Sequence, residues 1–376
     1  MESISFARGV PAPECLPVDE LADCARAAIE GGGPAVLSYG PGGGYAPLRD
    51  WIADRHGVEA ERVVLTNGSL QGLGFLAELL APGKRVLVEA PTYDRPLRIL
   101  ARVGAEAVPV PIDGEGLDPD GLEQALREGP PPAFLYTIPT FQNPSGRTLS
   151  LERRRRALEL ARRYGLLVVE DDPYGLVSFD GAPPPTLYEL AGGEGVVHSS
   201  SFSKTIAPGV RVGWLVLPRE LAAELEARAV STYISPPSLT QATVFEFLRR
   251  GNFEPNLERV RGLLRARRDA MLDALERHFA GGLCRGWSQP GGGYFVWLDL
   301  AEVVDAADLL ERGEREGVAF VKGADFFPGG AGGRSSARLA FSFVSPEEIA
   351  EGVVRLAAAA VAAAPAVAAA GSSRPA

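Results

Sequence analysis

The sequence has 376 residues, a length that favours about two domains over one minimal core. Apolar residues make up 46% and charged residues 23%, values typical of a folded globular protein rather than a disordered or fibrous one. There are 48 acidic against 38 basic residues, and the net charge of -10 disfavours a nucleic-acid partner.

The cysteines and histidines form no motif for metal binding or for a disulfide framework. No CxxC pair is present, and the histidines are scattered without an HExxH spacing. We therefore expect no metal and a reducing compartment, in which the thiols are structural; they are Cys15, Cys24 and Cys284.

Neither end of the chain predicts insertion into a membrane. The first eight residues lack the basic start and the apolar core of a signal peptide. The stretch 357–370 is rich in alanine, which is weakly apolar, and Pro365 interrupts it. We expect a cytoplasmic protein without a membrane partner, whose last helix is followed by a disordered tail over residues 365–376.

From residue 60 to residue 220, short valine-rich runs alternate with segments of helical period. This alternation predicts an α/β fold with a mostly parallel sheet covered by helices. Strands are expected at 63–66, 85–89, 133–137, 166–170, 196–199 and 211–217. Helices are expected at 70–80, 94–103, 119–128, 150–164, 218–229, 238–249 and 254–279.

The helix expected at 150–164 has a clear start signal. Ser150, followed by Leu151 and Glu152, resembles an N-cap, whose side chain accepts a hydrogen bond from the first turn. The arginine run 153–156 behind it is more typical of a solvated helix face than of a nucleic-acid site.

Polar residues directly follow three of the predicted strands. Residues 67–69 (Asn-Gly-Ser) follow the first strand, Asp171 follows the fourth, and the serines 199–201 lie at the end of the fifth. Ligands of open α/β sheets bind at the carboxyl ends of the strands. We therefore expect these residues to share one site.

The last part of the chain predicts a smaller α+β unit. Its strands are expected at 294–298 and 337–343, and its helices at 304–316 and from Pro346 onward. The N-terminal segment, residues 1–40, is expected to join this unit. The predicted division is therefore a large domain over residues 41–290 and a small domain over residues 291–364, ahead of the tail.

Lys204 stands in the run from Ser199 to Arg211, which combines small hydroxyl side chains, a bend and an arginine. A lysine amine can form a Schiff base with an aldehyde, while hydroxyls, N–H groups and a guanidinium can hold a phosphate dianion. An aldehyde cofactor that bears a phosphate needs both. For this run alone, a polar loop with a solvated lysine is the alternative.

Five motifs that follow one another along the chain favour the cofactor interpretation; they are Gly44-Tyr45-Ala46-Pro47-Leu48-Arg49, Glu89-Ala90-Pro91-Thr92-Tyr93, Gln142-Asn143-Pro144-Ser145-Gly146, Glu170-Asp171-Asp172-Pro173-Tyr174 and the lysine run. With them, the chain resembles the fold-type I aminotransferases that use pyridoxal 5′-phosphate, in the branch of the 2-aminoadipate and kynurenine aminotransferases. The resemblance extends from Ser5 to Phe343. It implies the aspartate-aminotransferase-like fold, with a large cofactor-binding domain and a smaller α+β domain.

The resemblance assigns the catalytic roles to Lys204, Asp171 and Tyr93. Lys204 corresponds to the Schiff-base lysine, which also moves the proton during the reaction. Asp171 corresponds to the carboxylate that keeps the pyridine nitrogen protonated, with Asp172 as its rival. Tyr93 corresponds to the aromatic residue that stacks on the cofactor ring, and a core tyrosine is the alternative.

The same resemblance implies the rest of the cofactor site. Tyr174 and Asn143 match the residues that bind the phenolic oxygen of the cofactor, although an Asn-Pro turn alone could explain Asn143. A phosphate cup at a helix N-terminus is implied for Gly68, Ser69, Ser201, Ser203 and Arg211. Leu70 stands where glutamine is usual, so only its backbone N–H could contribute.

Two residues are implied on the substrate side and one at a subunit interface. Arg338 matches the arginine that pairs with the substrate α-carboxylate, next to Asn143. Arg8 stands where relatives often have glycine near the substrate. Tyr39 matches a tyrosine that the family lends to the phosphate of the neighbouring subunit, which implies a homodimer with shared active sites.

The expected activity is transfer of the amino group of an L-amino acid to a 2-oxo acid in two half-reactions. An alternative on the same scaffold is a carbanion enzyme that performs β- or γ-elimination, replacement or carbon–carbon bond formation. Arg8 and the expected lack of a helix that covers the substrate, ahead of Phe6, keep this alternative open. A regulator with a DNA-binding domain ahead of this fold is a third hypothesis, disfavoured because none precedes Met1.

The sequence does not choose the amino acid. Candidates for contacts with its side chain are Arg8, Tyr233 and Lys322. The stretch 233–237 is either a wall of the substrate site or a loop.

Overall fold

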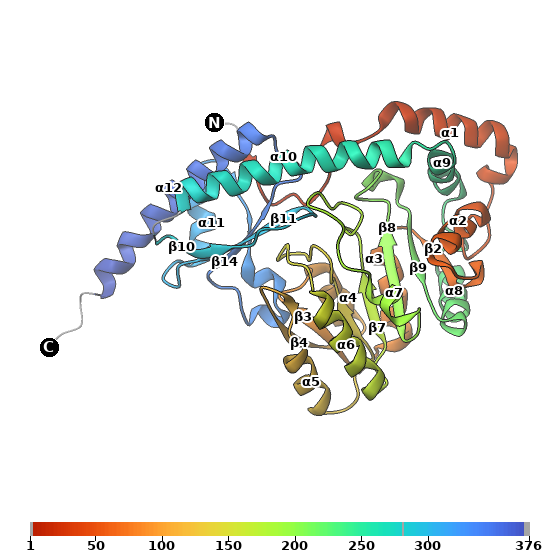
Figure 1. Cartoon of the computed structure of the whole chain (residues 1–376), viewed down its shortest axis with the longest axis horizontal. Helices are drawn as coiled ribbons and strands as arrows, with labels where there is room; N and C mark the ends of the chain where they lie inside the picture. Colours follow the sequence, from red (N-terminus) through yellow and green to blue (C-terminus); the bar gives the residue numbers. More distant parts are fainter. Residues whose placement is uncertain (1–2, 280–281, 372–376) are drawn as a thin grey trace.

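The computed structural model describes residues 3–279 and 282–371 (Figure 1). Its centre is a sheet with, in spatial order, β2 (Val63–Thr66), β9 (Gly213–Val216), β8 (Val196–Ser201), β7 (Val168–Asp171), β6 (Leu135–Thr137), β3 (Arg85–Ala90), β4 (Glu106–Asp113) and β5 (Gly116–Leu117). The pairs from β8 to β4 are parallel, whereas β9 is antiparallel to both of its neighbours and β5 to β4. The prediction of a mostly parallel sheet is confirmed.

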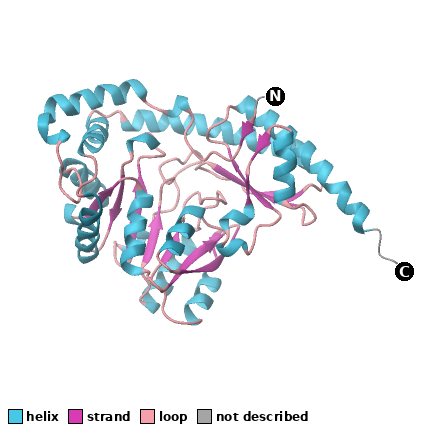
Figure 2. Cartoon of the chain, turned by 180° about the vertical axis from the view of Figure 1, so that it is seen from behind, coloured by secondary structure: helices cyan, strands magenta, loops and turns pink. Residues whose placement is uncertain are grey.

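Successive residues of each strand face opposite sides of this sheet, so each side can be covered by helices (Figure 2). Val169 and Val197 pack in one core, to which helices α3 (Ser69–Leu80), α4 (Asp94–Arg102) and α8 (Arg219–Tyr233) contribute. Val168 and Val196 pack in a second core with α2 (Ala46–His56), α5 (Pro119–Arg127), α6 (Leu151–Tyr164), α7 (Leu187–Ala191) and α9 (Ser238–Arg249). The large unit therefore has three layers, with helices on both faces of the sheet, because the valine-rich strands present apolar side chains on both faces.

A smaller unit lies beside the large sheet, and the long helix α10 (Phe253–Phe279) runs from one to the other (Figure 1). Its antiparallel sheet has the order β10 (Cys284–Trp287), β11 (Phe295–Leu300), β14 (Ser336–Ala340) and β13 (Val321–Lys322). Helices α11 (Ala306–Arg315) and α12 (Pro346–Gly371) pack on each other, and α12 also packs against α10. Short 3-10 helices complete the chain at Pro13–Cys15, Gly33–Leu37, Ala60–Arg62, Pro208–Val210, Gly323–Phe326 and Pro328–Gly330.

The N-terminal segment divides between the two units. Strand β1 (Ile4–Ser5) pairs in parallel with β12 (Val318–Ala319), on the side of the small unit. Helix α1 (Val18–Gly32), in contrast, packs against α9 of the large unit. At the other end, α12 extends past Pro365 to Gly371, and the last five residues of the expected tail lie outside the described part. The predicted domain boundaries stay a prediction.

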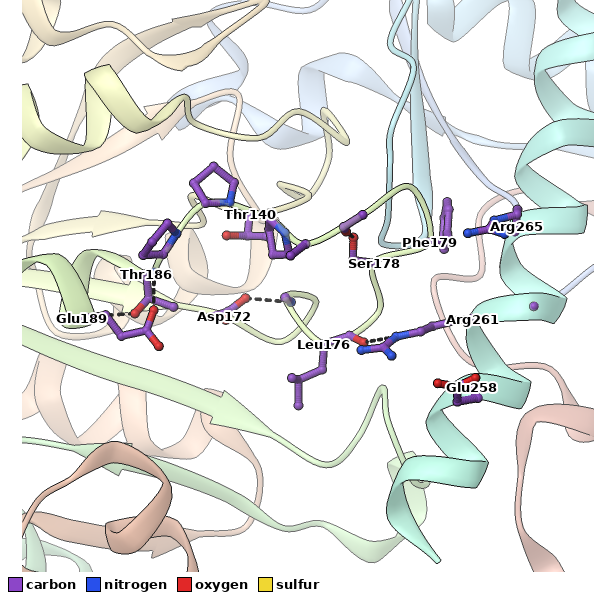
Figure 3. Close-up of a pocket in the computed structure, with 17 residues that line it drawn as sticks. Thr140, Asp172, Leu176, Ser178, Phe179, Thr186, Glu189, Glu258, Arg261 and Arg265 are labelled. Atoms are coloured by element: carbon purple, nitrogen blue, oxygen red, sulfur yellow. Dashed lines mark hydrogen bonds between the residues drawn. The ribbon is translucent and has the colours of Figure 1, made fainter.

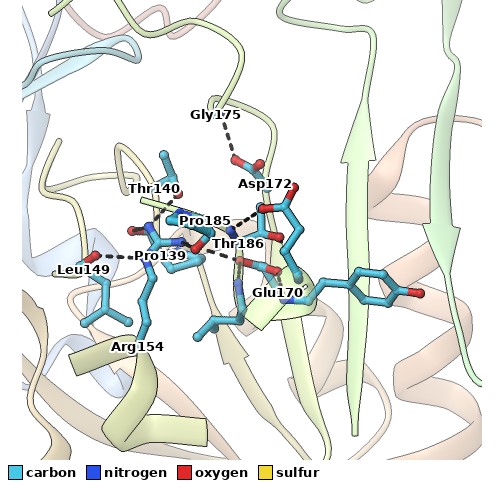
Figure 4. A network of polar contacts seen from close by, with 12 residues as sticks. Pro139, Thr140, Leu149, Arg154, Glu170, Asp172, Gly175, Pro185 and Thr186 are labelled. Atoms are coloured by element: carbon cyan, nitrogen blue, oxygen red, sulfur yellow. Dashed lines mark hydrogen bonds and ion pairs between the residues drawn. The ribbon is translucent and has the colours of Figure 1, made fainter. Parts of the chain in front are cut away.

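The arginine run at the start of α6 corrects one expectation. Ser150 caps the helix as expected and accepts a hydrogen bond from the N–H of Arg153. Arg154, however, is fully buried and donates to the carbonyls of Leu149 and Pro139 (Figure 4). It also lies 3.9 Å from the carboxylate of Glu170. The run is therefore not a uniformly solvated face, because Arg154 points into the interior.

The sequence predicted no disulfide framework, no metal site and no membrane-spanning helix. Cys15 and Cys24 are buried and Cys284 is half-buried, all as free thiols. In the described ranges, no group of three or more His, Cys, Asp or Glu side chains is arranged to hold a metal ion. No helix among the described residues has the length and apolar character needed to cross a membrane.

Gly213 tests how closely β9 approaches the start of α3. A methyl group at Gly213 would overlap the backbone of Gly68 and Ser69, which cannot move aside as a side chain can. We expect Gly213→Ala to lower the free energy of unfolding in urea by about 1–3 kcal/mol or more. Gly74→Ala, within α3 and with open space around the position, is the matched control and should stabilise the protein by about 0.5–1 kcal/mol. Equal effects of the two substitutions would contradict the close approach.

Candidate functional site

A cavity of about 370 Å³ lies at the carboxyl ends of the parallel strands. It brings together eleven of the predicted site residues: Gly68, Ser69, Tyr93, Asn143, Asp171, Tyr174, Ser201, Ser203, Lys204, Arg211 and Arg338. They come from both sheets and from the loops that follow β2, β3, β6, β7 and β8. The residues that were expected to share one edge of the sheet thus line one cavity.

Lys204 lies in the turn that follows β8, and its side chain is half-buried in the cavity. Its amine donates a hydrogen bond of 2.8 Å to the carbonyl of Gly9 and lies 5.1 Å from the ring centre of Tyr294. Burial lowers the pKa of Lys204 to about 8, and the cations of Arg338 and Arg211 act in the same direction. A substantial fraction of this amine is therefore neutral, and nucleophilic, near pH 8.

Asp171 is the last residue of β7, and its carboxylate is buried at the cavity. One oxygen, Oδ2, accepts a hydrogen bond of 2.7 Å from the hydroxyl of Tyr136, whereas the other, Oδ1, is buried without a partner among the described residues. Burial raises the pKa of Asp171 to about 6, against the opposing effect of the Tyr136 hydrogen bond. A buried acceptor without a partner marks a place for a donor from a ligand.

Asp172, the rival of Asp171, has a different environment. Its carboxylate accepts a hydrogen bond of 2.8 Å from the N–H of Gly175, which fixes the turn after β7 (Figure 4). Asp172 lines another cavity, of about 640 Å³, between that turn and α10 (Figure 3). There Arg261 donates to the carbonyl of Leu176, and Arg265 lies 3.9 Å from Asp180. This larger cavity contains neither Lys204 nor Arg338.

The start of α3 forms a cup with Arg211. Gly68 has a φ of 90°, which glycine adopts readily, and a side chain there would overlap the Arg211 guanidinium. The guanidinium donates a hydrogen bond of 2.7 Å to the carbonyl of Asn67 and stays exposed. Arg211 itself has a φ of 51°, an uncommon value that costs free energy outside glycine. The first N–H groups of α3 and a guanidinium together suit a phosphate.

Arg338 reaches the cavity from β14 of the small sheet. Its guanidinium donates to Asn143 Oδ1 at 3.0 Å and to the carbonyl of Ala7 at 2.8 Å, and it lies 4.3 Å from the ring centre of Phe295. Its Nε is buried and has no hydrogen-bond partner in the part of the chain that the structure describes. Burial lowers the pKa of Arg338 to about 10, so the group remains a cation at neutral pH. A buried cation with an unused donor is suited to bind a carboxylate.

Two tyrosines provide aromatic surface in the cavity. Tyr93 precedes α4 and is half-buried, and burial raises the pKa of its hydroxyl. Tyr174 is buried against Tyr294 and Phe295, and burial raises its pKa as well. Both hydroxyls therefore stay protonated at neutral pH and can donate hydrogen bonds.

The remaining candidates do not line the cavity of their own chain. Tyr39 is 80% exposed. Arg8 is exposed, with its guanidinium 4.0 Å from the ring centre of Phe343, although its neighbour Gly9 does line the cavity. Tyr233 packs against Phe75, and Lys322 lies 3.5 Å from Asp325, both away from the cavity.

Tyr136 and Gly9 are among the residues that contact the candidates directly and that sequence reasoning missed. Tyr136 was assigned only to a buried strand, and Gly9 only to the N-terminal segment. A signal for Tyr136 existed, since a hydroxyl within an otherwise apolar buried strand needs a partner. Gly9 had no signal, because it acts through its backbone carbonyl and through a lack of side chain. A methyl group at Gly9 would overlap the ring of Phe295.

Comparison with known proteins decides the family. The sequence model of one protein family, described as aminotransferase class I and II, matches residues 15–356. The chain belongs to this family. It is 41% identical to the 2-aminoadipate transaminase of Thermus thermophilus over 357 residues, which cover 94% of this chain and 89% of that protein. It is 35% identical to the aromatic-amino-acid aminotransferase 1 of Thermococcus litoralis, with coverage of 94% and 87%.

A solved structure adds the fold and the cofactor. The α-aminoadipate aminotransferase of Thermus thermophilus, complexed with N-(5′-phosphopyridoxyl)-L-leucine, matches with a TM-score of 0.91 and 40% identity, covering 97% of this chain and 93% of that one. The present chain, as a member of this family, therefore uses pyridoxal 5′-phosphate and acts on amino acids and 2-oxo acids. The comparisons give no support to elimination, replacement or carbon–carbon bond formation.

The cavity fits this cofactor. The unpaired oxygen of Asp171 offers an acceptor for a protonated ring nitrogen, and the cup at Gly68 and Arg211 offers donors for a phosphate. The amine of Lys204 and the surface of Tyr93 line the same space. The donors, the acceptor and the amine thus match the chemical groups of pyridoxal 5′-phosphate.

The pKa of Lys204 can be tested by chemical labelling, because the sequence has only three lysines, Lys84, Lys204 and Lys322. Only the neutral amine reacts, so in cofactor-free protein the labelling rate of Lys204 should reach half of its plateau near pH 8. Peptide mass spectrometry after brief acetylation at each pH measures all three residues together. A midpoint for Lys204 at about 10 or above, the ordinary range for lysine, would contradict the effect of burial.

Proposed function

We propose that Lys204 is the catalytic lysine of this aminotransferase and that Asp171, Arg338 and the cup at Gly68 position the cofactor and the substrate around it. The observation that carries the proposal is that Asp171, whose buried Oδ1 has no hydrogen-bond partner among the described residues, lines the same cavity as Lys204. The reaction is transfer of the amino group of an L-amino acid to a 2-oxo acid.

The ring end of the cofactor is assigned to Asp171 and Tyr93. When bound, pyridoxal 5′-phosphate supplies an aldehyde that combines with amines and a ring that accepts electrons from the substrate. The ionised Asp171 holds a proton on the ring nitrogen, which keeps the ring electron-poor. Tyr93 packs on the ring face, and the hydroxyl of Tyr174 donates to the phenolic oxygen, together with Asn143.

Lys204 moves the proton. Its amine must be neutral to act as a base, and its lowered pKa supports this role. The amine lies 2.8 Å from the carbonyl of Gly9, an acceptor that holds it in the cavity without adding a positive charge. Lys204 then removes the proton from Cα of the bound amino acid and returns a proton when the 2-oxo acid accepts the nitrogen.

Arg338 binds the α-carboxylate of the substrate. The unused Nε and the two hydrogen-bonded nitrogens form a planar fork, for which a carboxylate is the matching partner. The phosphate binds at the N–H groups of Ser69 and Leu70, at the hydroxyls of Ser201 and Ser203 and at Arg211. Arg8 is kept only as a candidate near the substrate entrance, because it lies outside the cavity.

Replacement of the lysine tests the proposal directly. Lys204→Ala removes both the attachment point and the base, so kcat for amino transfer should fall by about 10²–10⁴-fold or more. Lys84→Ala, at an exposed lysine, is the matched control and should keep the wild-type rate. Transfer of labelled nitrogen from a panel of amino acids to 2-oxoglutarate or pyruvate provides the measurement. A wild-type rate for Lys204→Ala would refute the role of this residue.

We further propose a cytoplasmic homodimer in which Tyr39 reaches the phosphate of the partner subunit. Tyr39 lies beside other exposed apolar residues: the N–H of Gly40 donates to Ser235 at 3.1 Å, next to Ile234, which is 54% exposed. Leu37, 63% exposed, extends the same surface. A contiguous exposed apolar patch of this kind supports an interface.

Mixing of subunits tests the shared site. Tyr39→Phe should weaken binding of pyridoxal 5′-phosphate by about tenfold or more, because it removes a hydrogen bond to a charged group. Each active site in the mixed dimer of Tyr39→Phe and Lys204→Ala draws on both chains, so one of its sites is fully wild type. Mixing the two weak variants should therefore restore activity. If the mixture is only as active as the sum of its parts, Tyr39 does not act across the interface.

A further inference from the structure

We infer that Tyr136 is the positioning residue for Asp171: its hydroxyl orients the carboxylate so that one oxygen faces the cofactor, and it keeps the carboxylate ionised. The inference rests on the role proposed for Asp171. It concerns a residue that does not line the cavity and that acts only through the carboxylate.

The register between β6 and β7 explains why Tyr136 and Asp171 lie close together. Tyr136 of β6 is directly opposite Val169 of β7, and Asp171 lies two residues further along β7. Side chains two residues apart on a strand point to the same face, so Tyr136 and Asp171 are diagonal neighbours. A tyrosine is long enough to span this diagonal, and its hydroxyl reaches Oδ2 at 2.7 Å. A shorter hydroxyl side chain at position 136 would not reach.

The hydrogen bond decides which oxygen is left for a ligand. Tyr136 is fully buried, so its hydroxyl is out of contact with bulk water. It donates to Oδ2 and so restrains the carboxylate, whereas Oδ1 has no hydrogen-bond partner within the described part of the chain; Asp171 itself lines the cavity. One oxygen is thus held by the protein while the other is reserved for the cofactor.

The surrounding groups explain why a donor is needed here. Burial is the largest effect on Asp171, and the neighbouring carboxylates of Asp172 and Glu89 also raise its pKa. Against these stand the Tyr136 hydrogen bond and the imidazole of His198. Tyr93 and Tyr174 line the same cavity, and the charge of Asp171 raises the pKa of both hydroxyls. Tyr136 is the only one of these groups with a hydrogen bond to the carboxylate among the described residues.

Tyr136 is itself a permanent donor. Burial and the adjacent Asp171 raise the pKa of its hydroxyl well above the ordinary value, so it does not ionise in the working range. A neutral donor stabilises the carboxylate over the carboxylic acid without neutralising its charge. Asp171 therefore keeps the negative charge that a protonated ring nitrogen requires.

Tyr136→Phe tests the inference, with the dissociation constant of pyridoxal 5′-phosphate as the main measurement. Loss of a hydrogen bond to a charged group should weaken binding at pH 7 by about tenfold to a hundredfold. Binding weakens in acid as Asp171 becomes protonated, and this acid limb should move to higher pH by about one to two units in the variant. The phosphate of the ligand titrates equally in both proteins, so it does not contribute to the difference.

Tyr188→Phe is the matched control. Tyr188 is also a buried tyrosine, but it lies in the other core and its hydroxyl has no hydrogen-bond partner. Its removal should leave both the affinity and the acid limb unchanged. Far-ultraviolet circular dichroism establishes that each variant is folded.

A double-mutant cycle separates positioning from a general packing effect. With Asp171→Asn as background, no ionised carboxylate remains at position 171, so Tyr136→Phe should cost less than about threefold in affinity. Equal losses in both backgrounds would overturn the inference, as would a Tyr136→Phe protein with wild-type affinity and an unmoved acid limb. Either result would leave the aminotransferase function intact, since wild type and the control would still bind the cofactor.

Should Tyr136→Phe not fold, 3-fluorotyrosine at position 136 provides an independent test. Fluorine strengthens the phenol as a donor with little change in volume. The acid limb should then move to lower pH, opposite to the shift expected for phenylalanine. An unmoved limb would contradict the proposed role of the hydroxyl.

Discussion

A buried carboxylate with one free oxygen is the constraint on which this site depends. Asp171 has lost most of its water, and only a single protein hydrogen bond compensates for that loss. Such a group is costly for the isolated protein and becomes favourable when a ligand brings a positively charged donor. With the role proposed for Asp171, part of the cofactor site lies at the end of a buried strand and is not confined to the loops above it.

The cavity around Asp171 is assembled from three parts of the chain that are distant in sequence. The N-terminal segment supplies the Gly9 carbonyl for Lys204, and β14 supplies Arg338. Arg338 in turn joins the N-terminal segment, at the carbonyl of Ala7, to the loop that carries Asn143. The roles proposed for Lys204 and Arg338 therefore depend on how the small unit packs against the large one.

Much of this arrangement could be predicted because parallel strands end at one edge. The polar residues after β2 and at the ends of β7 and β8 mark that edge in the sequence, and valine-rich runs mark the strands themselves. Strand β4 was missed because Pro109 and Pro111 argue against a strand. The prolines are tolerated since β4 pairs with β3 on one side, whereas β5 covers only Ile112 and Asp113 on the other.

Contacts that form only through tertiary packing could not be predicted from the sequence. A run of four arginines in a helix predicts a polar face, yet Arg154 is the one that the fold turns inward. The partner of Tyr136 depends on the register between β6 and β7, which the hydrophobic pattern does not specify. The role of Gly9 depends on a backbone carbonyl, and every residue has one.

Side chains alternate along β7, so neighbouring residues of this strand lie on opposite faces of the sheet. Asp171 faces the cavity, so Glu170, the residue before it, faces the other core. There its carboxylate accepts hydrogen bonds from the N–H groups of Leu187 and Tyr188 and lies 3.9 Å from Arg154 (Figure 4). Replacing Glu170 would leave Arg154 buried without an ion-pair partner among the described residues, at a cost of about 3–5 kcal/mol. The strand end that carries Asp171 is thus held on its other face by a buried ion pair, which helps a buried and incompletely hydrogen-bonded carboxylate to persist there.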